Sequence, residues 1–132
     1  MDENRIKIFD LEKRLIKFSL LIIELEEKIK RTRPGVHVAT QILRSGTSPA
    51  FNYGEAQVAE SLNDFIHKLR ICLKELKETG IILQIIFQKP LTNDLDLVSY
   101  MIQECGELTA IFIKSIEKSS DKLKKQSNES TN

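Results

Sequence analysis

The chain has 132 residues, a length that suits one domain with its own core and is too short for two ordinary domains. Hydrophobic residues make up 41% and charged residues 30%, which excludes an intrinsically disordered chain. The 20 Lys and Arg nearly balance the 19 Asp and Glu, whereas a duplex-binding domain is usually more basic. With only 5 Gly and 3 Pro, the composition favours long helices over many short strands.

The first segment carries a heptad pattern, in which apolar residues recur at alternating steps of three and four. Such a pattern places its members on one side of a helix. Pro34 and Gly35 are expected to stop this helix and turn the chain. The apolar positions are Ile8, Leu11, Leu15, Phe18, Ile22, Leu25 and Ile29.

The second segment, about residues 36–59, has a face made mostly of small residues, which allow two helix backbones to approach closely. Pro49 lies within this pattern, where it removes a backbone donor and crowds the carbonyl of Ser45, so a kink or a break is expected there. The small face and its neighbours are Ala39, Ile42, Gly46, Ala50 and Tyr53.

The third and fourth segments have recognisable helix ends. Ser61 with Asp64 resembles a capping box, and Lys89-Pro90 ends the third helix. Asn93 is expected to cap the fourth helix, and from about Ser119 the polar sequence predicts disorder. The sequence therefore predicts an all-α, antiparallel up-down four-helix bundle over residues 1–118, with a kinked second helix and a disordered tail over 119–132.

Two stretches are apolar on every side of their helices, residues 20–23 and residues 81–87. A helix with one buried face needs fewer apolar positions than this. The surplus indicates self-association, with a thicker core as the alternative. The candidate interface residues are Leu20, Leu21, Ile23, Ile81, Ile82 and Ile85.

A basic patch follows the first helix, because no acidic residue occurs between Lys28 and Gly54. Cations at the end of a helix stabilise its dipole, but repeated around the rim of an oligomer they would also bind the phosphates of RNA or DNA. Lys68 and Lys74 of the third segment lie either on a solvated face or on a second part of this surface. The rim candidates are Lys28, Lys30, Arg31, Arg33 and Arg44.

Catalytic and metal-binding patterns are weak. Asn52 and Glu55 share a helix face and are expected to form a polar network or a subunit contact. Catalysis is not expected of them, because Glu55 is a single carboxylate without a paired acid or base. Asp64-x-x-His67 is a single half-site, so no metal and no cofactor are expected. The spacing of Arg31 and His37 leaves a ribonuclease as a remote alternative.

The location is predicted to be the cytoplasm. No apolar signal segment follows the acidic start at Asp2 and Glu3, and the longest aliphatic run, residues 20–23, is far too short to cross a bilayer. Cys72 and Cys105 fall on apolar helix faces and are expected to be reduced, buried and unreactive.

The middle of the chain, from Gln41 to Leu83, resembles the four helix bundle protein family, also called the 23S rRNA-intervening-sequence proteins. The match runs in order through an Arg-Ser-Gly-Thr-Ser motif, an Asn-Tyr-x-Glu-Ala motif and a spaced Ser, Asp, Phe and Lys series. The matching positions are Gln41, Arg44, Ser45, Gly46, Thr47, Ser48, Asn52, Tyr53, Glu55, Ala56, Ser61, Asp64, Phe65, Lys68, Lys74, Glu75, Glu78 and Thr79.

This resemblance implies a bacterial homopentamer shaped like a short barrel. It also implies kinship with the accessory variability protein of diversity-generating retroelements, which looks like a basic pentamer that binds nucleic acid and a reverse transcriptase. Three departures matter: Pro49 stands one residue earlier than in the family, Gly54 replaces a frequent Arg, and Gly80-Ile81-Ile82 stands where many members have aromatic residues. The function expected is a non-enzymatic, homo-oligomeric accessory protein that binds RNA, DNA or a nucleoprotein partner, with a protein scaffold as the alternative.

Overall fold

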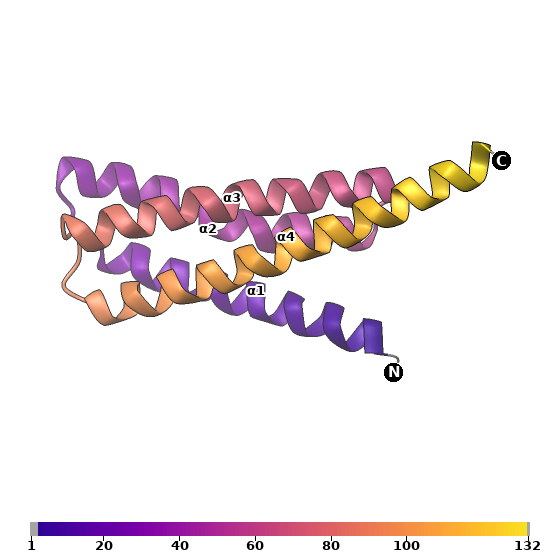
Figure 1. Cartoon of the computed structure of the whole chain (residues 1–132). Helices are drawn as coiled ribbons and strands as arrows, with labels where there is room; N and C mark the ends of the chain where they lie inside the picture. The colour runs from indigo at the N-terminus through magenta and orange to yellow at the C-terminus, as the bar shows by residue number, and fades with distance from the viewer. Residues whose placement is uncertain (1–2, 132) are drawn as a thin grey trace.

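Four helices make up nearly all of the protein (Figure 1). The structure, a computed structural model, describes the backbone of residues 3–131, and their side chains except at residues 4–6, 9 and 130–131. The helices are α1 (Glu3–Lys28), α2 (Arg33–Gln57), α3 (Leu62–Gln88) and α4 (Leu95–Thr131). No strand occurs over residues 3–131, so the predicted all-α class with four helices is confirmed.

Contacts between the helices fix their directions. Arg44 of α2 pairs with Glu75 of α3, and Glu55, further along α2, pairs with Lys68, earlier in α3. In the same way Lys28 contacts Asp94, whereas Arg14 contacts Glu104. In both pairs of helices, the residue numbers of the contacting residues rise along one helix and fall along the other. Neighbouring helices therefore run in opposite directions, as the colours of Figure 1 also show.

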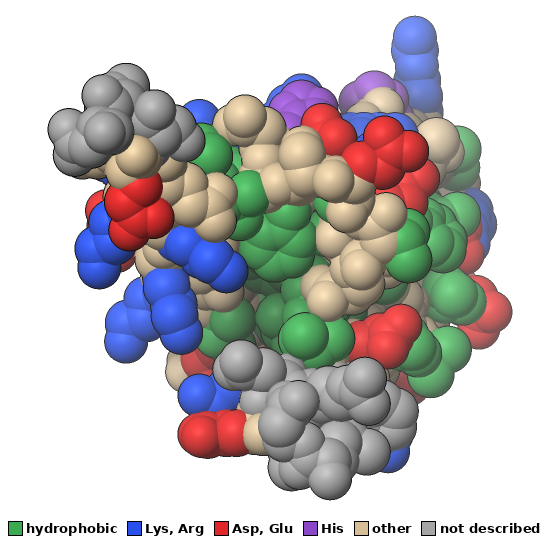
Figure 2. Space-filling model, turned by 90° about the vertical axis from the view of Figure 1, so that its right-hand side faces the viewer, with side chains coloured by type: hydrophobic (Ala, Val, Ile, Leu, Met, Phe, Trp, Pro, Cys, Tyr) green, Lys and Arg blue, Asp and Glu red, His purple; other side chains and the backbone are tan. Residues whose placement is uncertain are grey.

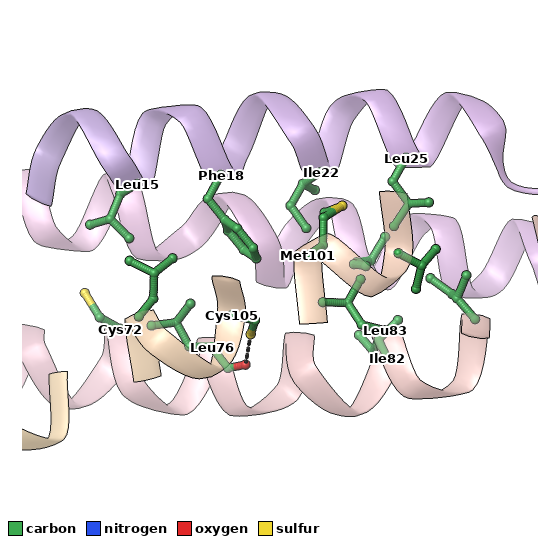
Figure 3. Close-up of a cluster of buried hydrophobic side chains, with 14 of the residues drawn as sticks. Leu15, Phe18, Ile22, Leu25, Cys72, Leu76, Ile82, Leu83, Met101 and Cys105 are labelled. Atoms are coloured by element: carbon green, nitrogen blue, oxygen red, sulfur yellow. Dashed lines mark hydrogen bonds between the residues drawn. The ribbon is translucent and has the colours of Figure 1, made fainter. Parts of the chain in front are cut away.

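The core is continuous along the bundle, and the heptad positions of α1 supply one side of it. Leu15, Phe18, Ile22 and Leu25 are buried against apolar side chains of the other three helices (Figure 3). Fully burying one such side chain contributes about 1.5–3 kcal/mol. The opposing core residues include Leu69, Cys72, Leu76, Leu83, Ile86, Val98, Met101, Cys105, Leu108 and Phe112.

The turn between α1 and α2 differs from the prediction that Pro34 and Gly35 stop the first helix. The first helix ends earlier, at Lys28, and Pro34 lies in the first turn of α2, where its missing N–H costs nothing. Thr32 caps α2, because its hydroxyl accepts a hydrogen bond from the Gly35 amide at 3.2 Å.

The ends of α3 and α4 follow local capping rules. Ser61 caps α3 by accepting from the Asp64 amide at 3.1 Å, as predicted. At α4 the cap is Asp94 and not the expected Asn93, since the Asp94 carboxylate accepts from the Leu97 amide at 3.1 Å. Either side chain is a good cap, and only the course of the backbone decided between them.

The second helix continues through Pro49, so the chain does not break there. Pro49 is buried, and its carbonyl accepts a hydrogen bond from the Cys72 thiol at 3.5 Å. One turn earlier, Gly46 lies against the side chain of Ile22, which occupies the space that a methyl group on Gly46 would need. The small face of α2 therefore sets how closely α1 and α2 pack.

The fourth helix corrects the prediction of a disordered tail from residue 119, because it extends to Thr131 and passes through the expected boundary at residue 118. Leu123 is partly buried, and with Ser120 and Lys124 it lines a groove beside Ile66 and Arg70 of α3. The Lys, Gln and Glu residues of this segment favour a helix. Across residues 3–131, no helix has a stretch both long and apolar enough to span a membrane.

Candidate binding surfaces

The cations of the predicted basic rim lie at the end of the bundle where α1 meets α2. There the Lys28 ammonium pairs with Asp94 at 2.8 Å and with Glu24 at 3.1 Å, and these contacts raise its pKa. Arg31 donates to the carboxylate of Glu26 at 3.1 Å. Glu24 and Glu26 of α1 and Asp94, which caps α4, therefore neutralise part of the rim.

Arg44 lies away from this end and faces α3. It pairs with Glu75 at 2.9 Å and also with Glu78. Glu75 is a buried carboxylate, so Arg44 supplies the counter-charge that its burial requires. Arg44 thus has a structural partner and does not join the other rim candidates.

The remaining rim candidates, Lys30 and Arg33, are exposed at the α1–α2 turn. Over the part of the chain that the structure describes, neither has an ion-pair partner. The Lys30 amide donates to the Leu91 carbonyl at 2.8 Å, which brings the α3–α4 connection to the same end. His37 is exposed on α2, whereas Arg31 is held by Glu26, so these two residues have different surroundings.

The polar residues expected to form one network are held separately. The Asn52 amide donates to the Ser48 hydroxyl at 2.9 Å, within α2. Glu55 pairs instead with Lys68 of α3 at 2.9 Å. Lys68 therefore already has an ion-pair partner, whereas Lys74, six residues further along α3, is exposed.

A second cluster of cations, which we call the basic end, lies where α4 extends past the rest of the bundle. Within the described residues none of its side chains has an ion-pair partner. Over residues 114–125 five lysines accompany two acids, and Figure 2 shows blue side chains gathered on one side of this end. The sequence pattern did not indicate this cluster, because residues 119–132 were predicted to be disordered. The basic end consists of Arg70 on α3 and Lys118, Lys122, Lys124 and Lys125 on α4.

An open cavity of about 650 Å³ adjoins the basic end, and Figure 2 shows hydrophobic side chains at its floor. Its aromatic residues are Tyr53, which meets Phe112 edge-on, and the partly buried Phe65. Burial raises the pKa of Tyr53 to about 12, so its hydroxyl stays protonated at neutral pH. Its charged lining residues are Lys7, Asp10, Arg14, Lys118 and Lys122.

The two thiols are buried, as predicted. Cys72 and Cys105 donate hydrogen bonds to carbonyl oxygens, that of Cys105 reaching Leu76 at 3.2 Å (Figure 3). Burial raises their pKa values to about 12 and about 11, which suppresses the nucleophilic thiolate. Among the described side chains, no group of three or more His, Cys, Asp or Glu is arranged to hold a metal ion.

The candidate interface residues divide into two sets. Leu20 is 61% exposed and Ile81 is 65% exposed, and Ile23 and Ile85 also face outward. Ile82 belongs to the core, and Leu21 packs against the core, so these two residues do not fit the predicted interface. The helical turn places adjacent positions about 100° apart, which separates Ile81 from Ile82.

Comparison with solved structures finds a similar helical protein. No protein-family model and no curated protein matches the chain. Its structure is similar to a crystal structure of a protein of unknown function from the S23 ribosomal protein family of Bacteroides thetaiotaomicron, with a TM-score of 0.76 and 29% sequence identity. The similarity covers 84% of this chain and 98% of the neighbour, so it extends over most of the chain and fits the helical family suggested by the motifs.

Proposed function

We propose that the protein is a non-enzymatic, cytoplasmic accessory protein that self-associates and binds single-stranded RNA or DNA. The exposed apolar residues on α1 and α3 support self-association, because large apolar patches on a soluble protein mark contact surfaces. The resemblance to the four helix bundle family suggests five subunits. A helical neighbour of unknown function is compatible with this role.

The observation that carries nucleic-acid binding is the basic end beside an aromatic cavity. Its lysines lack ion-pair partners among the described residues, whereas Lys28, Arg31 and Arg44 of the expected rim are paired. Single-stranded nucleic acids bind where cations contact phosphates and aromatic rings stack on bases. Phe65 lines the cavity with Lys118 and Lys122, and five subunits would repeat this arrangement.

Two charge-reversal variants distinguish the basic end from the rim. Lys122→Glu with Lys124→Glu changes the basic end, and Lys30→Glu with Arg33→Glu changes the rim by the same net charge. We expect the first pair to weaken binding of a fluorescent single-stranded RNA at least tenfold and the second pair to leave it within about twofold. The affinity of the unchanged protein should fall steeply with added salt.

The outcomes separate the alternatives. A larger loss in the Lys30 and Arg33 pair would move the site to the rim. Binding by the unchanged protein no tighter than by a neutral control protein would reject nucleic-acid binding and leave a scaffold for protein partners, such as a reverse transcriptase. Light scattering tests the assembly independently, since a monomeric mass would overturn self-association.

A further inference from the structure

The cavity beside the basic end lies where α1 and α4 separate. Arg14 holds α1 against α4 through Glu104 and Glu107, and the part of α1 before this contact diverges from α4 (Figure 1). Residues 7–14 of α1 and residues 111–122 of α4 include the two facing walls, and the volume is about 650 Å³. Ligand sites in proteins commonly have about 300–1,000 Å³, so this volume suffices for a nucleobase with its sugar.

The floor and the mouth of the cavity differ in chemistry. Tyr53, Phe65 and Leu69 line it from α2 and α3, and all three are buried or partly buried. Lys118 and Lys122 line it from α4, and both are exposed. An aromatic, apolar floor suits the face of a base, and cations at the mouth suit the phosphates on either side of that base.

Asp10 is the single acidic residue among the described residues that line this cavity. It lies one turn before Arg14, on the side of α1 that faces α4. Within the described part of the chain, its carboxylate has neither an ion-pair partner nor a hydrogen-bond donor. A carboxylate repels phosphates, so the contribution of Asp10 to a nucleotide site is toward the donor groups of the base.

Among the bases of RNA, guanine offers a carboxylate the most suitable edge. Its Watson–Crick edge carries two adjacent donors, N1–H and the N2 amino group, and the two oxygens of a carboxylate accept from both. Adenine and cytosine present an amino group beside a ring nitrogen that is itself an acceptor, and uracil presents one N–H between two carbonyl groups. A carboxylate therefore gains two hydrogen bonds from guanine and meets an acceptor on each of the other bases.

We propose that the cavity holds one guanine base of the bound strand and that Asp10 is the residue that selects it. This inference rests on the proposed nucleic-acid binding and names the base that the site takes. Lys7 lines the cavity three residues before Asp10, on the same side of α1, and donates to O6 of the guanine. The pair of Lys7 with Glu3, at 3.5 Å between exposed side chains, is weak enough to yield.

A measurement of base preference tests the role of Asp10. The affinities for an oligouridine and for the same strand with one central guanosine are measured by fluorescence anisotropy. The unchanged protein should bind the guanosine strand about tenfold tighter, because uracil cannot supply both donors to Asp10. Asp10→Asn should bind the two strands within about twofold of each other, because the amide places a donor against the donors of guanine.

The ratio of the two affinities is the readout, since Asp10→Asn also removes a negative charge and thereby strengthens binding to both strands. Glu117→Gln makes the same charge change at an exposed position of α4 that does not line the cavity. This control should keep the preference of about tenfold for the guanosine strand.

The tyrosine ring of the cavity provides a second measurement, which needs no RNA strand. The chain has two tyrosines, and Tyr100 is exposed on α4, so Tyr100→Phe leaves Tyr53 as the sole tyrosine. The NMR signals of the Tyr53 ring should shift when guanosine monophosphate is added and shift much less with uridine monophosphate. Adding Asp10→Asn to this variant should remove the difference between the two nucleotides.

The outcomes separate this inference from the proposed function. If the unchanged protein binds neither strand, the proposed nucleic-acid binding fails, and this inference fails with it. Equal binding of the two strands would leave nucleic-acid binding intact and contradict the guanine site. A guanosine preference that persists in Asp10→Asn, or that disappears equally in Glu117→Gln, would show that Asp10 does not select the base.

Discussion

At the scale of single residues, Gly46 shows how one position controls the packing of two helices. The side chain of Ile22 lies where a Cβ atom of residue 46 would be, and Ile22 is itself fully buried, so it has little room to move. Gly54, on the same helix, has open space around it. The two glycines of this helix therefore differ. Gly46 allows α1 and α2 to approach closely, whereas packing does not require a glycine at position 54.

We expect Gly46→Ala to lower the free energy of unfolding by about 1–3 kcal/mol, because the new methyl group overpacks the contact with Ile22. The matched change Gly54→Ala should raise stability by about 0.5–1 kcal/mol, since alanine favours the helix and meets no neighbour. Urea unfolding followed by circular dichroism measures both. Equal effects of the two changes would show that Ile22 does not constrain residue 46.

At the scale of helices, the pairing of α1 with α4 is sparser than the other pairings, and Figure 1 shows the start of α1 diverging from α4. Arg14 bridges the two helices by donating to Glu104 at 2.9 Å and to Glu107 at 3.2 Å. A guanidinium shared by two carboxylates is one of the stronger surface pairings, because several charge-assisted hydrogen bonds act together. This cluster holds the first half of α1 against the bundle.

Arg14→Ala should therefore loosen the beginning of α1 selectively. A pair of this kind contributes about 1 kcal/mol, so amide hydrogen exchange over residues 3–14 should accelerate about fivefold. Exchange in α3 should not change. Lys17→Ala, at an exposed position of the same helix, is the control, and equal acceleration by that variant would rule out a specific role for Arg14.

At the scale of the whole molecule, the two exposed apolar surfaces connect stability with assembly. The folded protomer has a buried core along its length, yet Leu20 and Ile23 on α1 and Ile81 and Ile85 on α3 remain exposed. Association that buries these surfaces stabilises the folded state by mass action. Stability should then depend on protein concentration.

The melting temperature should rise by roughly 5–10 °C when the protein concentration is raised a hundredfold. Leu20→Glu should remove this dependence, and the control Tyr100→Glu, at an exposed position of α4, should retain it. Thermal unfolding by circular dichroism at the two concentrations is the measurement. A melting temperature that is constant for the unchanged protein would be inconsistent with self-association.

The sequence by itself determined the helices and most of the core. The heptad positions of α1 from Leu15 to Ile29 are buried as expected, because a period near 3.6 leaves only one side of a helix for apolar residues. The Ser61 cap followed from local chemistry as well. The motifs from Gln41 to Leu83 pointed to a helical family, and the solved neighbour agrees with that fold.

Only the tertiary structure decided which polar and apolar side chains remain available at the surface. The pairing of Arg44 with Glu75 and of Lys28 with Asp94 joins residues far apart in the chain, so no local pattern could show that the predicted rim is partly neutralised. The extension of α4 likewise brings Leu123 to the groove that Ile66 of α3 also lines. Charge neutralisation and burial depend on distances between helices, and those distances exist only once the helices have packed.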